Sequence, residues 1–492
     1  MKSSTVLSLV PKGTRTRTLP SRSIARESVL RRLRRILYSI AFMQTIIPHF
    51  KADDNFSPGL LLTFCAVMCY TSAMKDLLVN KFIPHDVEAD VPASKSILNR
   101  ALLFAALARG RVHLRFGAFA EDTRALLSCL AALGIEMTEE SYGMTICGCG
   151  GDFPNRTASL NVMSAGTAAR FLPVVLAFAG GEYEFDSSEQ MKRRPMDVLD
   201  ELERLGVTIR YRGERGHFPF RLVSKGVTRD EAVIETDRST QFASGLMIAA
   251  TVHPRPFTVH LKGSRTNGSY LKMTEAMLRS FGAGVARDGN DVIVSPPSCP
   301  PREYEVEPDF SGACYLYALS LLFSVRVLVR GIKRESLQGD TAFFRLLEGR
   351  DVRFTQTERG LLADGTAVRG FDGFEENLQD FSDQALTVAA LAPFARTPSR
   401  LTGLEHIRAQ ECDRVHAIVE NLSALGIPAL YREDILTITP APVRGGTVRT
   451  FGDHRVAMAF SLIGLKTGNV TIDDPDCTKK TFEGYFDLIS RL

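Results

Sequence analysis

The apolar positions after residue 74 follow one pattern again and again. A run with apolar residues three and four apart ends in Leu-Gly, Phe-Gly or a close variant, and a short strand-like run follows. The pattern appears as ALLSCLAALGIEMT, VLDELERLGVTIRY, EAMLRSFGAGVAR, FFRLLEGRDVRF and AIVENLSALGIPALY, and a last copy, YFDLISRL, stops at the C-terminus. We therefore predict one α/β unit of about 70 residues used six times, in two domains of three units each.

A glycine ends each of the first five repeat helices. Glycine adopts the left-handed backbone conformation without steric cost, so each is predicted to be a helix C-cap. These residues are Gly134, Gly206, Gly282, Gly349 and Gly426. The proline-rich run DVIVSPPSCPPREYEVEPD, between the third and fourth repeats, predicts a passage of the chain from one domain to the other.

The first 73 residues lack this pattern. Residues 1–35 are rich in Arg, Lys and Ser and contain one acid, Glu27, and two apolar stretches follow. Both stretches are shorter than the roughly 18 to 20 residues that span a bilayer. An upstream extension of a reading frame that begins at Met74, a plastid transit peptide and a membrane hairpin are the alternatives. We favour the first and expect residues 1–73 to lie outside the fold, disordered or loosely packed.

Composition limits the class of protein. The 492 residues are 45% hydrophobic and 24% charged, with a net charge of +4, which is ordinary for a soluble globular protein. This charge is too small to favour nucleic acid. Nine cysteines form no paired CxxC motif, and the histidines form no HExxH pair. We expect a reduced, cytoplasmic protein without a metal site and without membrane attachment.

The stretch PASKSILNRALL, residues 92–103, places Lys95, Ser96 and Arg100 in the opening turns of an apolar helix that Gly110 is predicted to close. Free amide groups at a helix N-terminus attract anions. Ser96 and Arg100 are four residues apart and share one face of the helix. The segment alone fits either a phosphate or carboxylate site or a capped helix with solvated charges.

Other apolar helices also begin with polar or small residues. SAGTAARFL permits close backbone approach, MKRRPMDVL carries basic residues before Pro195, which can start a helix, and RSTQFASGLM offers two hydroxyls and an amide. The second half adds acids and cations in DFSDQALT, QECDR, DHRVAMAF and CTKKTF. Each group could be a helix cap, but together they predict helix N-termini directed at one cleft. The candidate residues are Gly166, Arg170, Lys192, Arg193, Arg194, Ser239, Thr240, Gln241, Asp383, Glu411, Asp413, Arg414, Asp453, His454, Arg455, Lys479 and Lys480.

From about Met74 to Leu492 the chain resembles the 5-enolpyruvylshikimate 3-phosphate (EPSP) synthase family. The motifs that carry the resemblance are ASKSILNRALL, AGTAARF, RRPM, STQFASGLM, PDFSGACY, LQGD, SDQALT, QECDR, DHRVAMAFSL and CTKKTF, in family order. The resemblance implies an inverse α/β barrel of two domains, each with three βαβαββ units. It also implies two crossings, which we place near residues 93 and 308. Domain I would then comprise residues 74–93 and 309–492, and domain II residues 94–308.

The resemblance further implies transfer of the enolpyruvyl group of phosphoenolpyruvate to the 5-hydroxyl of shikimate 3-phosphate. Phosphate would be released, without a cofactor, on the shikimate pathway to chorismate and aromatic amino acids. Asp383 would accept a proton and Glu411 would donate one, with Lys95 also catalytic. Ligands of shikimate 3-phosphate would be Lys95, Ser96, Arg100, Ser239, Thr240, Gln241, Asp383 and Gln410. Ligands of phosphoenolpyruvate would be Lys95, Gly166, Arg194, Gln241, Arg414, Arg455 and Lys480.

Several positions depart from the family pattern. Gln410 stands where many members have a lysine, which removes a cation from the shikimate side. Ser164, Asn267 and Phe171 replace a frequent asparagine, serine and proline. Gly166 is retained, so we expect glyphosate to inhibit by competing with phosphoenolpyruvate, and we expect a monomer. The alternatives are the sister transferase that acts on UDP-N-acetylglucosamine and a catalytically inactive scaffold of the same fold.

Overall fold

The computed structural model of the chain describes residues 76–492. The chain divides into two units, Met1–Ala73 and Met74–Leu492, and the second is the subject here. The expectations for residues 1–73 lie outside the described residues. Within residues 76–492, no helix combines the length and the apolar character that a bilayer crossing requires.

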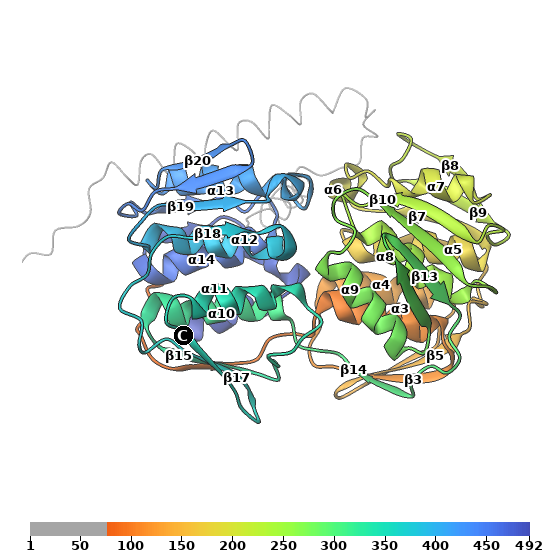
Figure 1. Cartoon of the computed structure of the whole chain (residues 1–492), viewed down its shortest axis with the longest axis horizontal. Coiled ribbons are helices and arrows are strands. Elements are labelled where there is room, and N and C mark those ends of the chain that lie inside the picture. Colours follow the sequence, from red (N-terminus) through yellow and green to blue (C-terminus); the bar gives the residue numbers. More distant parts are fainter. Residues whose placement is uncertain (1–75) are drawn as a thin grey trace, which may run out of the picture. The chain divides into compact units, whose positions relative to one another are not determined.

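The first half of the second unit contains three repeats of helices and strands (Figure 1). The first repeat has α3 (Lys95–Leu107), β3 (Arg109–Arg115), α4 (Glu121–Ala132), β4 (Met137–Glu140), β5 (Gly143–Cys149) and, from later in the chain, β14 (Glu303–Glu305). The second has β6 (Thr157–Asn161), α5 (Gly166–Ala179), β7 (Gly181–Asp186), α6 (Glu189–Lys192), α7 (Val198–Arg204), β8 (Thr208–Tyr211) and β9 (Phe220–Ser224). The third has β10 (Glu231–Glu235), α8 (Gln241–Ala249), η2 (Ala250–Val252), β11 (Phe257–Lys262), α9 (Ser269–Ser280), β12 (Gly284–Asp288) and β13 (Asp291–Ser295).

The second half contains three more repeats. The fourth has β2 (Val87–Ala89), α10 (Phe310–Phe323), β15 (Arg326–Arg330), η3 (Gly339–Thr341), α11 (Ala342–Glu348), β16 (Arg353–Gln356) and β17 (Gly360–Asp364). The fifth has β18 (Glu375–Asn377), η4 (Gln379–Gln384), α12 (Ala385–Leu391), η5 (Ala392–Phe394), β19 (Ser399–Thr402), η6 (Glu405–Ala409), α13 (Arg414–Ala424), β20 (Ala429–Arg432) and β21 (Ile435–Ile438). The sixth has β22 (Gly446–Val448), α14 (His454–Thr467), β23 (Val470–Ile472), η7 (Pro475–Lys480), α15 (Tyr485–Arg491) and β1 (Leu77–Val79).

Each repeat has its own small sheet. In the third repeat the order is β10-β11-β13-β12, with β10 and β11 parallel and the other neighbours antiparallel. Four other sheets have four strands in the same arrangement, and the sixth has three, in the order β1-β23-β22. A parallel pair joined through a helix and followed by a hairpin is the predicted βαβαββ unit. The α/β fold class predicted from the sequence is thus confirmed.

Three strands each pair with a strand that is far away in the sequence. β1 pairs with β23 and β2 with β15, whereas β14 returns to pair with β3. An isolated bridge joins Ala93 to Pro308 where the two connecting segments meet. Buried apolar residues form two clusters, one between positions 93 and 306, the other from positions 79–89 and 310–489. We propose on this basis the domain boundaries near 93 and 308.

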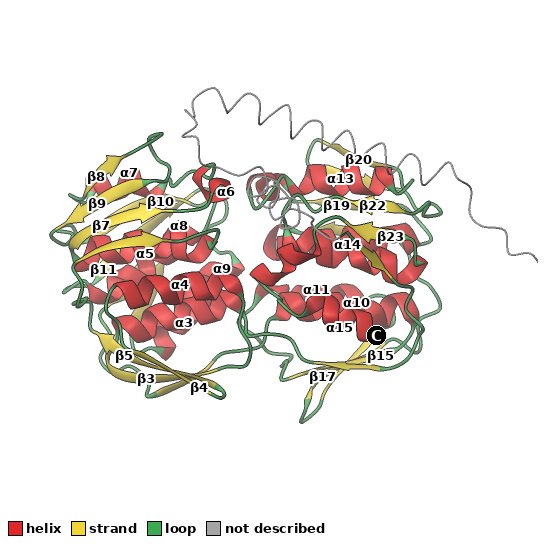
Figure 2. Cartoon of the chain, turned by 180° about the vertical axis from the view of Figure 1, so that it is seen from behind, coloured by secondary structure: helices red, strands yellow, loops and turns green. Residues whose placement is uncertain are grey.

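The first helix of each repeat is the most deeply buried element. In α10 every residue from Phe310 to Leu322 is buried, and in α5 every residue from Thr167 to Phe178. A helix that is apolar on all sides needs partners on all sides. α5 packs on α8, and α14 packs on both α10 and α12, while the sheets lie outside the helices (Figure 2). The N-termini of these central helices are therefore where the polar residues predicted to form a site must gather.

Four of the five predicted glycine caps have left-handed backbones. Gly134, Gly206, Gly282 and Gly426 have φ between +83° and +94°. The prediction for Gly349 is wrong, because its φ is −62° and the left-handed residue is Asp351, with φ 64°. The chain turns two residues later, at an aspartate, a residue type that tolerates this conformation.

Two other local predictions also need correction. Gly110 does not close α3, because the helix ends at Leu107 and Gly110 already belongs to β3. Pro195 does not start a helix, because it lies between α6 and α7, and α7 begins at Val198. At the first place the helix ends before the predicted glycine, and at the second the helix begins after the predicted proline.

Candidate active site

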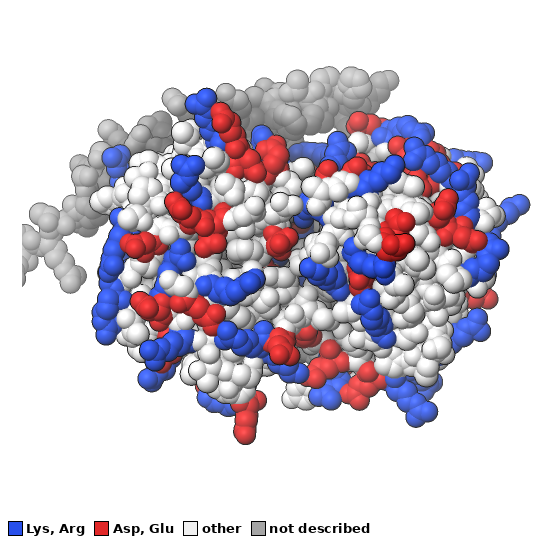
Figure 3. All heavy atoms as spheres, viewed as in Figure 1, with Lys and Arg blue, Asp and Glu red and all other residues white. Residues whose placement is uncertain are grey.

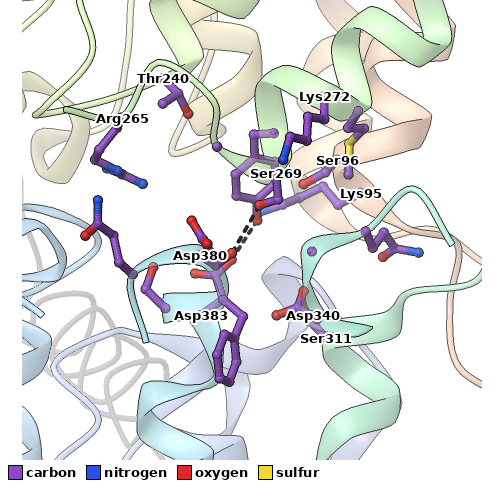
Figure 4. Close-up of a pocket in the computed structure, with 18 of the residues that line it drawn as sticks. Lys95, Ser96, Thr240, Arg265, Ser269, Lys272, Ser311, Asp340, Asp380 and Asp383 are labelled. Atoms are coloured by element: carbon purple, nitrogen blue, oxygen red, sulfur yellow. Dashed lines mark hydrogen bonds between the residues drawn. The ribbon is translucent and has the colours of Figure 1, made fainter. Parts of the chain in front are cut away.

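A cavity of about 240 Å³ lies where the central helices begin (Figure 4). Lys95 and Ser96 open α3, Thr240 is the N-cap residue of α8, and Asp383 precedes α12. The other lining residues at helix entrances are Asp309 and Ser311 of α10 and Arg455 of α14. Five of the six central helices thus begin at one cavity, as the entrance residues predicted. Their free amide groups and N-terminal dipoles favour a bound anion.

Asp383 lies in this cavity and is held by donors from both halves. Its Oδ2 accepts hydrogen bonds from the Tyr270 hydroxyl at 2.7 Å and from Arg455 at 3.0 Å, and its Oδ1 accepts from Arg414 at 3.0 Å. Burial raises the pKa of this carboxyl, but Arg455 and Arg414 outweigh burial and hold the pKa below its usual range. Asp383 is not a helix cap, since all three contacts are to side chains. It is an ionised acceptor facing the cavity.

Arg414 is fixed by buried acids. Its Nε donates to Asp453 at 2.8 Å while another nitrogen binds Asp383, and Gln410 accepts a further hydrogen bond from it. Asp453 is the N-cap of α14, accepting from the amide of Arg455 at 2.9 Å. A buried ion pair of this kind is costly to break, because either partner would leave an uncompensated charge. Arg414 therefore orients Asp383.

Glu411 lies in a second group, which adjoins the cavity through Lys95. Its carboxylate pairs with Lys480 at 2.5 Å and lies 3.9 Å from Arg194. Burial raises the pKa of Glu411, but the charges of Lys480, Arg194 and Lys95 lower it to about 2. The side chain of Gln190 also donates to the backbone oxygen of Glu411 at 2.8 Å, which joins the two halves here.

Gly166 lies beside this second group. A Cβ atom at this position would be 3.7 Å from Arg194 and 3.8 Å from the side-chain oxygen of Gln241. These are ordinary van der Waals distances, so a larger residue such as alanine would not clash with the protein at this position. It lies between a guanidinium and an amide.

Lys95 connects the two groups. It forms an ion pair with Asp122 at 2.9 Å and lines the cavity. Burial lowers the pKa of Lys95, but Asp122 and Glu411 more than offset this, so the pKa is raised and the side chain stays cationic. Asp122 was not a predicted site residue, and its place on α4 gave no sequence signal.

Some predicted ligands do not line the cavity. The guanidinium of Arg100 is buried and donates to the backbone oxygen of Ser96, to Thr274 and to Ser244, at 2.8 to 3.2 Å. Ser239 accepts from the amide of Gln241 at 3.3 Å. Arg100 therefore ties α3 to α8 and α9 beneath the cavity, and Ser239 shapes the entrance of α8.

The cavity also contains residues that sequence reasoning did not select. Tyr270 binds Asp383, although it comes from α9 in the other half. Asp309 caps α10, and burial raises its pKa to about 6. Asp340 accepts from Ser311, and Arg265 contributes a further cation. PDFSGACY and LQGD, quoted above, contained two of these acids, but no local pattern marked Tyr270 or Arg265.

The fold and site define a class of protein with two sets of βαβαββ units and two buried carboxylates, Asp383 and Glu411, set among cations at the entrances of the central helices. Within residues 76–492, no group of three metal-binding side chains occurs. On the face shown in Figure 3, acidic and basic side chains are interspersed, without an extended basic area.

Comparison with known proteins identifies the family. Residues 83–489 match the family model for EPSP synthase (3-phosphoshikimate 1-carboxyvinyltransferase). A 3-phosphoshikimate 1-carboxyvinyltransferase of Nostoc sp. is 35% identical over 411 residues, which cover 82% of this chain and 96% of the relative. One from Thiobacillus denitrificans is 36% identical over 409 residues, with the same coverage of both chains. The chain belongs to the EPSP synthase family.

A solved structure agrees with this fold. EPSP synthase from Acinetobacter baumannii superimposes with a TM-score of 0.70 at 22% identity, covering 84% of this chain and 97% of that one. At this identity the likeness concerns the fold alone.

Proposed function

We propose that the protein is a 3-phosphoshikimate 1-carboxyvinyltransferase that joins phosphoenolpyruvate to shikimate 3-phosphate and releases phosphate. The observation that carries the proposal is the pair of carboxylates, Asp383 and Glu411, each set among cations at neighbouring helix entrances. Addition of the 5-hydroxyl to C2 of phosphoenolpyruvate requires a proton acceptor near the hydroxyl and a proton donor near C3. Elimination of phosphate then reverses both roles.

We assign Asp383 as the acceptor, because it is ionised and faces the cavity. We assign Glu411 as the donor. Its pKa of about 2 is set by cations, so an anionic substrate that draws Lys480 and Arg194 toward itself raises that pKa. The phosphate and carboxylate of phosphoenolpyruvate supply that anion. Substrate binding would thereby convert Glu411 into an acid able to hold a proton.

We place phosphoenolpyruvate near Glu411 and shikimate 3-phosphate in the cavity. Lys95, Gly166, Arg194, Gln241, Arg414, Arg455 and Lys480 would bind the first, and Lys95, Ser96, Thr240 and Asp383 the second. Arg100, Ser239 and Gln410 would act from behind these contacts. Arg100 ties α3 to α8 and α9, Ser239 shapes the entrance of α8, and Gln410 binds Arg414. Glyphosate would compete with phosphoenolpyruvate beside Gly166, and the protein would be a cytoplasmic monomer.

The decisive experiment measures phosphate release by the full chain with both substrates. We expect release that requires shikimate 3-phosphate and phosphoenolpyruvate together, and inhibition by millimolar glyphosate. Replacing shikimate 3-phosphate by UDP-N-acetylglucosamine separates the two transferases of this fold. Release with the sugar nucleotide alone, or none with either acceptor, would refute the proposed function.

We also propose that residues 1–73 take no part in catalysis, because every proposed site residue lies between Lys95 and Lys480. A chain that starts at Met74 should then have the same kcat and KM as the full chain. A loss of activity on removing these residues would require a third element in the domain plan.

A further inference from the structure

Glu411 lies in a short segment without regular structure, between η6 and α13. Its backbone oxygen accepts a hydrogen bond from the side-chain amide of Gln190 at 2.8 Å. Within residues 76–492, the backbone of Glu411 makes no other hydrogen bond. Backbone groups are strong hydrogen-bonding groups that folded chains normally pair, so a segment with one such bond depends on it. The position of the proposed acid thus depends on a side chain 221 residues away.

Gln190 belongs to the opposite half of the chain. It lies on α6, at the edge of its half that faces the other half (Figure 1). Arg194, shortly after α6, is 3.9 Å from the carboxylate of Glu411. One turn of the chain therefore reaches Glu411 twice, through its backbone and through its side chain. Lys480, the third partner, comes from the same half as Glu411.

The turn that carries Gln190 is itself anchored. Met191 is buried, and its amide donates to the hydroxyl of Ser188, the N-cap of α6, at 3.3 Å. The hydroxyls of Ser188 and Ser164 share a hydrogen bond of 2.7 Å. Ser164 lies just before Gly166, at the entrance of α5. α6 is thereby tied to α5, so the side chain of Gln190 extends toward Glu411 from a fixed base.

We propose that Gln190 is a positioning residue for proton donation by Glu411. This inference rests on the proposed function. The amide of Gln190 holds the backbone of Glu411 so that its carboxylate stays between Lys480 and Arg194, the cations proposed to bind phosphoenolpyruvate. Gln190 acts through the backbone of Glu411 and adds no charge to the site. Because this hydrogen bond joins the two halves, the proposed acid is aligned only while the halves are in contact.

The test removes the donor and measures turnover of the full chain with both substrates. Gln190→Met keeps the length of the side chain but has no N–H donor, and Gln190→Asn keeps an amide that is one methylene shorter. In both variants kcat should fall roughly 3- to 10-fold, the effect of one neutral hydrogen bond, while the KM of phosphoenolpyruvate stays within about twofold of the wild-type value. The solvent deuterium isotope effect on kcat should increase, because proton donation becomes slower relative to the other steps.

A control lies on the same short helix. Glu189 precedes Gln190, is exposed and pairs with Lys192 at 2.9 Å. Glu189→Met therefore changes α6 without removing a contact to Glu411, and its kcat, KM and isotope effect should equal those of the wild type. The melting temperatures of all three variants should stay close to the wild-type value, because neither side chain is part of an apolar core.

A double variant separates positioning from a general structural role. Glu411→Gln cannot donate a proton, so adding Gln190→Met to it should lower kcat no further. An equal fall of kcat in both backgrounds would show that Gln190 acts independently of Glu411 and would overturn the inference. An unchanged kcat in Gln190→Met, or a change in KM alone, would overturn it too. Failure of the proposed function would appear separately, as a wild-type chain that does not release phosphate with the two substrates.

Discussion

Asp383 and Glu411 are both buried carboxylates among cations, but they are held in different ways. Asp383 has three hydrogen-bond donors, Tyr270, Arg414 and Arg455, and Arg414 is itself anchored by buried Asp453. Glu411 has one close partner, Lys480, and a more distant one in Arg194. A carboxylate with several anchored donors stays ionised, whereas one that depends on a single lysine responds when an anion competes for that lysine.

Both residues are carboxylates, so the two proposed roles, proton acceptor and proton donor, are distinguished by their contacts and not by the type of side chain. A proton acceptor must be ionised when the substrate arrives, and the contacts of Asp383 ensure that. A proton donor must acquire a proton during the reaction cycle, and an anion that competes for Lys480 would raise the pKa of Glu411. The number and anchoring of the donors, more than burial, would distinguish the proposed base from the proposed acid.

Removing each carboxyl in turn should have the largest effect. Asp383→Asn and Glu411→Gln preserve shape but abolish proton transfer, so kcat should fall about 10²- to 10⁴-fold while substrate Kd values stay close to those of the wild type. Asp413→Asn is the matched control, because Asp413 caps α13 and otherwise pairs with Arg408, and an asparagine can still cap. Steady-state kinetics and calorimetry check this. Normal turnover in either amide variant would remove that residue from the mechanism.

Removing one cation from the group around Asp383 should mainly lower the stability of the fold, whereas removing one from the group around Glu411 should mainly weaken substrate binding. Arg414→Met leaves buried Asp453 without its cationic partner and removes one of the three donors to Asp383, so the free energy of unfolding should fall by about 3 to 5 kcal/mol. Lys480→Met should have a smaller effect on stability but raise the KM of phosphoenolpyruvate roughly 10- to 100-fold, through loss of a charge-assisted contact. Denaturant unfolding and kinetics measure the two effects. Equal destabilisation by both variants would contradict the proposed difference in anchoring.

The smallest effect should come from Tyr270→Phe, which removes one donor to Asp383. The pKa of Asp383 lies below its usual value, so its ionised form stabilises the fold at neutral pH, and this contribution is lost as the pH falls through the folded-state pKa. Losing a donor to the ionised form raises that pKa, so the acid limb of the pH–kcat profile should move up by about one pH unit. Activity at pH 7.5 should change only a few-fold. A profile identical to that of the wild type would mean that the arginines alone set the pKa.

The repeat units and most of their helix ends could be predicted from the sequence. Helical periodicity and a terminal glycine are local signals, and four of the five glycines are left-handed as expected. Entrances such as Lys95 and Ser96 were also visible, because polar residues interrupt an apolar pattern there. The strands β1, β2 and β14 have only three residues each, too few for a periodic signal, and the crossings were inferred from the family resemblance.

Contacts between distant residues could not be predicted in this way. Arg100 and Arg414 look alike in sequence, each a cation near the start of an apolar helix. The structure places Arg100 among hydroxyls and Arg414 between two acids. Tyr270 meets Asp383 across 113 residues of chain, and nothing local to either position specifies that contact.

The pairing of β1 and β2 with the second half has a consequence for folding during synthesis. All strands of the first three sheets have left the ribosome once β14 has emerged, so that half can acquire its core while the rest is still being made. Leu77–Val79 must wait for Val470–Ile472, the last strand within residues 76–492. Contacts of such long sequence separation form slowly. The earliest part of this unit to be synthesised is therefore among the last to be ordered, and the half that carries Asp383 and Glu411 is completed only after β23 has emerged.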